Sequence, residues 1–241
     1  YVDGSGNTIQ VRGYQGLSLG RLYEDNSEYP NSYSCPKLKT IVFESNVESM
    51  GEDAFEAYED FSSLTSVSLG SKITRISAHA FRGATSLTSV VLPDSLTEIG
   101  NSAFSGTGLT SLVIPDSVTS IGSQAFYNIP ITSLTIPDSV TSIGSQAFLG
   151  TGLTSLVIPD SVTSLGDGAF GNAPLKTLDI GSGLKDINSF GVEAFLNVCK
   201  TLESVTIDSA QGLGKGGNSY NLSYVDGSGN TIQVRGYQGL S

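Results

Sequence analysis

The stretch LTSLVIPDSVTSIGSQAF, Leu109–Phe126, decides the fold, because its last thirteen residues recur unchanged 22 positions later as Ile136–Phe148. Units of this kind begin at Leu38 and follow one another as seven complete repeats and a truncated eighth. The central units are 22 residues long, and the two outermost complete ones stretch to 26 and 27. A fixed period of this length predicts a solenoid, in which each unit buries its apolar face against its neighbours.

Each unit divides into three short elements. In the first, Leu112 and Ile114 alternate with Ser111 and Val113, a period of two that predicts a short strand with one face inward. Pro115 cannot donate to a strand ladder and predicts a turn. The letters VTSIG predict a second strand, ended by Gly122 with a positive φ, and SQAF predicts a single helical turn capped by Ser123.

The apolar positions of one unit are expected to share one face, which stacked units bury together. These inward residues are Leu109, Leu112, Ile114, Val118, Ile121, Ala125 and Phe126. A phenylalanine recurs at the end of every unit and predicts an aromatic column through the core. Its members are Phe55, Phe81, Phe104, Phe126, Phe148, Phe170 and Phe195. At about 1.5–3 kcal/mol for each large side chain buried, this column is expected to be the main source of cohesion.

The pattern IPxSVTxIGxxAF recurs across adjacent units and resembles the BspA-like class of leucine-rich repeats, over about Leu38–Ala210. The resemblance implies a curved, right-handed repeat solenoid, mainly β with single helical turns. It also implies an extracellular, cell-surface location, a role in adhesion, and no catalytic residues. We divide the chain into a connector or cap with a partial hairpin at 1–37, a solenoid of about 7.5 repeats at 38–210, and a Gly- and Tyr-rich hairpin connector at 211–241.

Composition excludes several classes of function. Twelve basic residues against 23 acidic ones give a net charge of −11, which repels nucleic-acid phosphates. The sequence contains no run of about 18 apolar residues, so no membrane-spanning helix is predicted. His79 is the only histidine, and no nucleophile is spaced to work with it, so we interpret it as an ordinary surface residue of its repeat. We expect neither enzymatic activity nor a cofactor.

A second, longer repeat joins the two ends of the chain. Tyr1–Ser18 recurs letter for letter as Tyr224–Ser241, an offset of 223 residues. One hypothesis is that the chain is a window on a tandem array of solenoid modules; the alternative is an isolated terminal duplication. The second copy reads as strand, turn and strand over 219–225, 226–230 and 231–237, which predicts a β-hairpin. The residues expected to form the assembly connector are Tyr1, Ile9, Val11, Tyr14, Tyr220, Tyr224, Ile232, Val234 and Tyr237.

Outward strand positions form two rows of small residues on the expected concave face. The candidate binding residues in these rows are Ser89, Val91, Ser111, Val113, Ser133, Thr135, Ser155 and Val157. The rows contain none of the Trp, Tyr or Arg residues that dominate high-affinity interfaces. They suit weak, multivalent contact with a protein or glycan, or a structural spacer. The leading function is therefore adhesion through this face, and the alternative is a module that assembles end to end into a fibre.

Two further patterns leave alternatives open. Cys35 and Cys199 lie at opposite ends of the stack, too far apart to bridge within one solenoid. Either Cys199 meets Cys35 of the next module, or both thiols are unpaired. Aspartates recur after the proline of successive units, at Asp94, Asp116, Asp138 and Asp160. Such a row could hold Ca²⁺, but we interpret each carboxylate as the solvated cap of its own turn, and expect no metal site.

Overall fold

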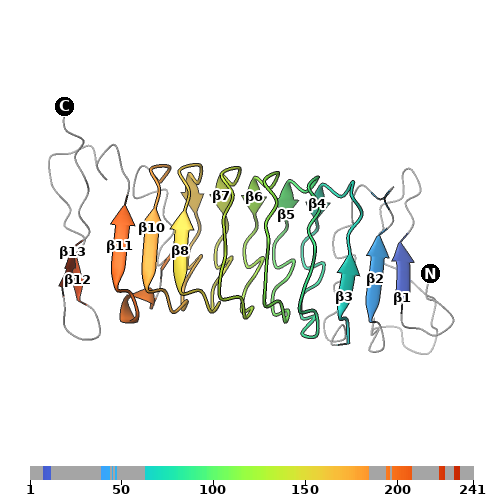
Figure 1. Cartoon of the computed structure of the whole chain (residues 1–241), viewed down its shortest axis with the longest axis horizontal. Helices are drawn as coiled ribbons and strands as arrows, with labels where there is room; N and C mark the ends of the chain where they lie inside the picture. Colours follow the sequence, from blue (N-terminus) through green and yellow to red (C-terminus); the bar gives the residue numbers. More distant parts are fainter. Residues whose placement is uncertain are drawn as a thin grey trace.

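The computed structural model describes residues 8–11, 39–43, 45, 47, 63–184, 194–195, 197–207, 223–225 and 231–233. Phe55 and Cys35 lie outside these residues, as do the connector positions Tyr1, Tyr14, Tyr220, Val234 and Tyr237. For β1, β12 and β13 the backbone alone is described. The strands stand side by side along the long axis of a solenoid (Figure 1).

The first row of strands forms two parallel sheets with a gap between them. At one end lie β1 (Thr8–Val11), β2 (Thr40–Phe43) and β3 (Ser66–Ser68), in that order. At the other end β10 (Thr177–Ile180) pairs with both β8 (Ser155–Ile158) and β11 (Ser204–Ile207). β1 adds a strand to the sheet ahead of Leu38, where the sequence indicated only a connector.

In the middle of this row the predicted strand at Leu112–Ile114 is not formed. The units that begin at Leu87, Leu109 and Ile131 contain no regular strand there, and the one bridge between neighbouring coils is the isolated parallel bridge from Ser68 to Val91. The alternation of burial persists, with Leu112 and Ile114 buried. Alternating polarity therefore specifies which side chains face the core, and it does so here without a regular ladder.

The second row forms a continuous parallel sheet, as VTSIG predicts. Its strands are β4 (Arg75–Ile76), β5 (Glu98–Ile99), β6 (Ser120–Ile121), β7 (Ser142–Ile143) and β9 (Ser164–Leu165). The same position of each unit pairs with the next, Ser120 with Ser142 and Ile121 with Ile143. The proline turn before this row is also confirmed, since the N–H of Val118 donates to the carbonyl oxygen of Pro115 at 3.0 Å.

The predicted helical turn SQAF is wrong. Gln124 has φ 56° and Asn128 has φ 54°, and left-handed residues at this spacing interrupt a right-handed helix. The segment instead bonds to the next coil: the N–H of Phe104 donates to the carbonyl of Ala125, and that of Phe126 to Ala147, each at 2.8 Å. These bonds make a third line of coil-to-coil contacts. Within the described residues the one helix is η2, the 3-10 helix Val198–Lys200.

Gly122 is required for a different reason from the one expected. Its φ is not positive. A Cβ on Gly122 would lie 2.7 Å from both the main-chain nitrogen and the Oδ1 of Asn101 in the preceding coil. Gly100 makes the same approach to Ala78, at 2.7 Å. Glycine is therefore needed here because successive backbones come too close for a side chain.

The core confirms the predicted inward face and the aromatic column. All seven predicted inward residues of the unit from Leu109 are buried. Phe81 to Phe170 are fully enclosed, and their rings stack at centroid distances of 5.2 to 5.5 Å. Phe195 continues the column at 6.0 Å from Phe170 but is only partly buried. Rings stacked at this spacing stabilise the fold beyond the contribution of the apolar area that each ring buries.

The predicted hairpin is present at the far end of the stack. β12 (Ser223–Val225) pairs antiparallel with β13 (Thr231–Gln233), with Tyr224 opposite Ile232. In Figure 1 this hairpin lies beyond β11, while β1 lies at the opposite end of the molecule. The two copies of the sequence TIQ are therefore at opposite ends, one in a parallel sheet and the other in an antiparallel hairpin.

Candidate binding face

The outward surface of the first row, from Ser66 to Val157, is the candidate binding face. Every predicted member is exposed: Ser89, Val91, Ser111, Val113, Ser133, Thr135, Ser155 and Val157. The three valines are 81%, 79% and 59% exposed, although Val113 and Val157 each lie between two buried apolar residues and Val91 lies between the partly buried Val90 and the buried Leu92. The stacking of coils places them in register, so the serine hydroxyls and the valine methyl groups form parallel rows.

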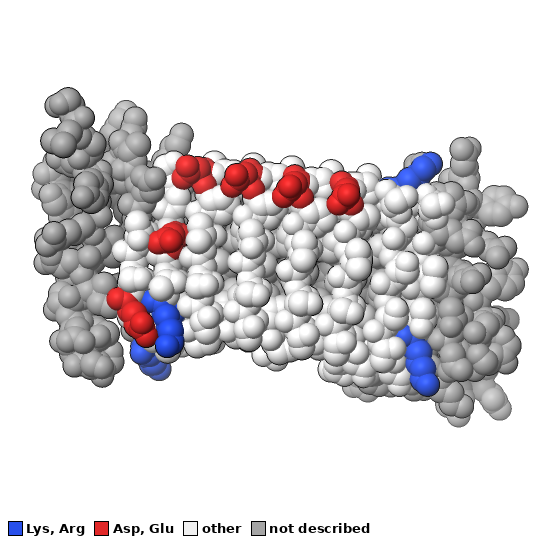
Figure 2. All heavy atoms as spheres, in the orientation of Figure 1, with Lys and Arg blue, Asp and Glu red and all other residues white. Residues whose placement is uncertain are grey.

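The candidate binding face is uncharged and has charged borders (Figure 2). Acidic side chains run in a single row along one edge of this face. The exposed aspartates at equivalent places in successive coils are Asp94, Asp116, Asp138 and Asp160. At the C-terminal end Lys176 and Glu203 form an exposed ion pair at 3.5 Å. The exposed Lys39 stands at the other end. A partner would therefore meet hydroxyl and methyl groups in the centre and carboxylates along one side.

The aspartate row shows one turn-capping contact. Asp160 accepts a hydrogen bond through Oδ1 from the N–H of Ser182 at 2.6 Å, across to the next coil. Among the described residues, no three His, Cys, Asp or Glu side chains come together as a metal site would need. Asp160 thus bonds to the turn of the following coil, whereas the sequence led us to expect a solvated cap of its own turn.

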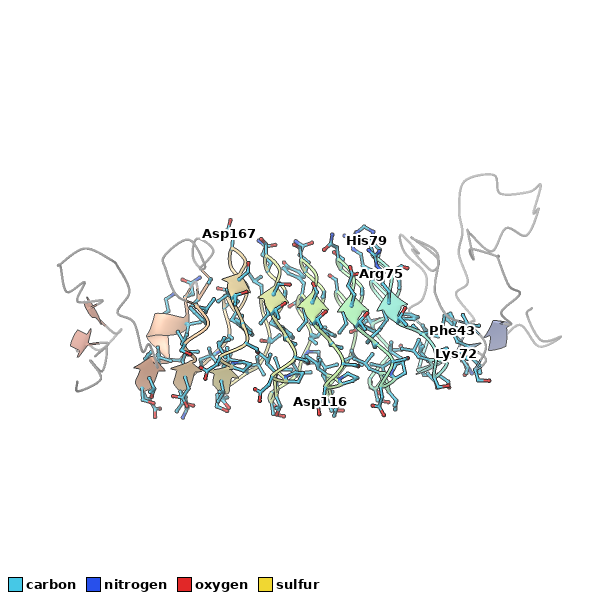
Figure 3. All side chains as sticks on the ribbon, turned by 90° about the horizontal axis from the view of Figure 1, so that it is seen from above. Phe43, Lys72, Arg75, His79, Asp116 and Asp167 are labelled. Atoms are coloured by element: carbon cyan, nitrogen blue, oxygen red, sulfur yellow. The ribbon has the colours of Figure 1, made fainter. Side chains whose placement is uncertain are left out.

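His79 lies on the opposite side of the solenoid from Asp116 (Figure 3). It occupies the left-handed position of its unit, with φ 56°, and its N–H donates to the carbonyl of Asn101 at 2.8 Å. Gln124 and Gln146 occupy the same position of later units. The residue is thus part of the line of coil-to-coil bonds through its main chain.

Hydroxyl groups have a structural role that sequence reasoning missed. Thr97, Thr119, Thr141 and Thr163 each donate through Oγ1 to the carbonyl of the threonine one coil earlier, at 2.9 to 3.3 Å. The signal was available, since a threonine recurs at this position in five successive units, from Thr74 to Thr163. The threonines lie at the edge of the second row, so they tie the coils together without contributing to the candidate binding face.

The repeat profile described as the BspA type Leucine rich repeat region (6 copies) matches residues 28–130, 56–151 and 119–216. The chain belongs to the BspA-type leucine-rich repeat family. Its solenoid of parallel strands with little helix is the architecture that this family assignment leads one to expect. No curated protein matches the chain by sequence. No helix among the described residues has the length and apolar character needed to span a membrane.

Solved structures of other leucine-rich repeat proteins are similar to this BspA-type chain. A leucine-rich repeat protein of Bacteroides ovatus is 21% identical, with a TM-score of 0.42, over 86% of this chain and 64% of its own length. A leucine rich cell surface protein of Faecalibacterium prausnitzii is 23% identical, with a TM-score of 0.38, over 84% and 73%. The T. pallidum Leucine Rich Repeat protein is 26% identical, with a TM-score of 0.42, over 79% and 81%. The chain thus spans about two thirds of the B. ovatus protein.

Proposed function

We propose that the chain is a non-enzymatic extracellular surface protein that binds a protein or glycan through the candidate binding face. The observation that carries this proposal is the line of exposed valines, Val91, Val113 and Val157, on a face otherwise made of hydroxyl groups. Single exposed apolar residues are ordinary, but here valines recur at one repeat position in three of four successive coils, and Thr135 occupies that position in the remaining coil. The resemblance to adhesive surface proteins supports the extracellular location.

The chemistry of the face favours an extended ligand held by many weak contacts. Hydroxyl groups both donate and accept hydrogen bonds, and methyl groups pack against the apolar faces of sugars or the side chains of a peptide. Repetition along the coils offers the same contact several times, and linked weak contacts raise the overall affinity. We therefore expect affinity to rise steeply with the length of the ligand.

The test is a binding screen of the full chain against a glycan array and a panel of purified extracellular-matrix proteins. A ligand found this way should be lost by the pair Val91→Asp and Val113→Asp. The matched control is the pair Thr74→Asp and Ser164→Asp, which adds the same charge to exposed positions of the second row. Equal loss with both pairs, or no binding to either panel, would overturn the proposal.

A second function is favoured by the duplicated segment. We infer that the chain is one module of a tandem array with a 223-residue period, which assembles end to end into an extracellular filament. Supporting this, the shared letters TIQ form strands at both ends of the solenoid, in β1 and β13. Negative-stain electron microscopy of the native protein should show fibres with a regular axial repeat. Discrete short particles would contradict the filament and leave the adhesive function as the remaining proposal.

A further inference from the structure

The sequence TIQV has two different structural partners in this chain. At Thr8–Val11 it forms β1, which pairs parallel with β2, Thr8 opposite Thr40 and Ile9 opposite Ile41. At 231–233 the first three of these letters, TIQ, form β13, which pairs antiparallel with β12. One sequence is thus able to complete a solenoid sheet and to form a hairpin.

The letters TIQV match the first-row strands of the solenoid itself. β2 reads TIVF, β10 reads TLDI and β11 reads SVTI. In β10, Leu178 and Ile180 are buried while Thr177 and Asp179 are exposed. TIQV has the same apolar alternation, which is why it fits beside β2 in register. β13 therefore carries the pattern of a solenoid strand, although it has no parallel partner among the described residues.

A strand has two edges, so a single copy can pair with a neighbour on each side. β13 gives one edge to β12. β1 pairs with β2 along one edge, and among the described strands nothing pairs with its other edge. A strand in the place of β1 could therefore hold β2 on one side and a hairpin partner on the other. The resulting order would be β12, β13, β2, β3.

β13 cannot take that place within one molecule. β12 and β13 lie beyond β11, at the opposite end of the solenoid from β2 (Figure 1). A contact between β13 and β2 is therefore a contact between two copies, and it joins the tail of one to the head of the next. Such a heterologous contact repeats without limit unless the rotation closes a ring.

We propose that the edge of β2 is the docking site for residues Thr231–Gln233 of a second copy of this module. The added strand pairs parallel in the register that β1 shows, with Thr231 opposite Thr40, Ile232 opposite Ile41 and Gln233 opposite Val42. This is strand addition at a sheet edge, in which main-chain hydrogen bonds supply the affinity. The inference rests on the proposed array and specifies its joint. The second copy is a separate chain, whose strand takes the place of β1; in one continuous polypeptide with this period, residue 231 of one module is residue 8 of the next, and the joint is the β1–β2 pairing itself.

The first experiment frees the edge of β2 in the full-length chain. The pair Ile9→Pro and Gln10→Pro removes β1 from its ladder, because successive strand N–H groups point to opposite edges and one of the two faces β2. In sedimentation velocity we expect this variant to form dimers and longer species that increase with concentration. The second copy of the same sequence provides a matched control, Ile232→Pro with Gln233→Pro. The mean mass of this variant in solution should be no larger than that of the unaltered chain. Combining both pairs should abolish the association.

A second experiment tests the register. In a chain with Cys35 and Cys199 replaced by serine, Thr40→Cys and Thr231→Cys should form a disulfide between molecules, since residues opposite each other on paired strands are close enough to bridge. The pair Val42→Cys and Thr231→Cys is displaced by two positions and should not. The disulfide is expected to form fastest when Ile9→Pro and Gln10→Pro are also present. Without these prolines it should form slowly, because β1 must first leave the edge of β2.

Three outcomes would overturn the proposal. The first is association of the β1 variant that persists when β13 also carries prolines, and the second is equal cross-linking of Thr231→Cys to positions 40 and 42. The third is the absence of cross-links both with and without the prolines in β1. The last outcome counts even if the proline variant fails to fold, because the unaltered strands are tested separately. Cross-links at position 40 without fibres from the native protein would support the pairing of residues 231–233 with β2 and overturn the proposed array. Fibres without these cross-links would support the proposed array and overturn the pairing of residues 231–233 with β2.

Discussion

The hydroxyl of Ser117 donates to the main-chain oxygen of Leu96, one coil earlier, at 2.6 Å. The same bond is made by Ser95 to Ile73 and by Ser139 to Val118, at 2.7 and 2.6 Å. These serines follow the aspartate of the proline turn, so the letters PDS encode a bond from each coil to the preceding one. Ser161 stands at the equivalent position, but its buried Oγ has no hydrogen-bond partner.

This difference gives a prediction with an internal control. Ser117→Ala should lower the free energy of unfolding by about 1–2 kcal/mol, because it removes a hydrogen bond and leaves the carbonyl of Leu96 unpaired. Ser161→Ala should leave it unchanged or raise it slightly, since that hydroxyl is buried without a partner. Denaturant unfolding with matched slopes measures both. Equal costs at the two serines would contradict the bond assignment.

The aromatic column predicts the largest single effect in the core. Phe126 stacks on Phe104 at 5.5 Å and on Phe148 at 5.2 Å, and it is fully buried. Phe126→Ala should cost about 3–5 kcal/mol through lost burial and the cavity left behind. Val113→Ala should change the free energy of unfolding by less than about 0.5 kcal/mol, because Val113 is exposed. A cost at Phe126 no greater than at Val113 would mean that the column does not hold the coils together.

The repeat made the core predictable from sequence, because burial follows directly from an alternation that successive units share. The buried set from Leu109 to Phe126 was predicted residue by residue for this reason. Local backbone geometry was harder to predict. SQAF has the composition of a helical turn, and nothing within one unit shows that Gln124 is left-handed. A signal for the other left-handed position lay across units, since the residue two after each phenylalanine of the column from Phe81 onward is Gly or Asn, as at Gly106, Asn128 and Gly150.

The exposure of the candidate binding residues was predicted from the sequence, but the contacts between their coils were not. Exposure of Val113 followed from alternation, whereas the interruption of the first-row sheet did not. The parallel pairing of β1 was missed because the duplicated segment was interpreted as half of a hairpin. Its resemblance to TIVF at β2 was visible, but pairing between strands more than 30 residues apart depends on how the ends of the stack are completed. A strand sequence alone does not specify which neighbour it will take.

The aspartate row predicts a response to chelator. Addition of excess EGTA should leave the melting temperature unchanged, because Asp160 is bonded to the N–H of Ser182 and stabilises a turn without a metal. Asp160→Ala should lower the free energy of unfolding by about 1 kcal/mol, the usual cost of a lost capping bond. Differential scanning calorimetry measures both. A fall in melting temperature with EGTA that is restored by Ca²⁺ would show that the row binds calcium.

Two glycines separate the effect of close packing from that of backbone conformation. Gly122→Ala places a Cβ 2.7 Å from the main-chain nitrogen of Asn101, so two coils must move apart, and we expect a loss of about 3 kcal/mol. Gly83→Ala meets no atom within 4 Å, but Gly83 has φ 74°, so its cost of about 1–2 kcal/mol comes from the left-handed backbone alone. Gly83→Asn should recover part of that loss, because asparagine tolerates this conformation, whereas Gly122→Asn should be at least as damaging as Gly122→Ala. Unfolding of the four variants by denaturant decides the matter. If Gly122→Ala costs less than Gly83→Ala, then contact between successive backbones is not what requires glycine at the end of the second strand.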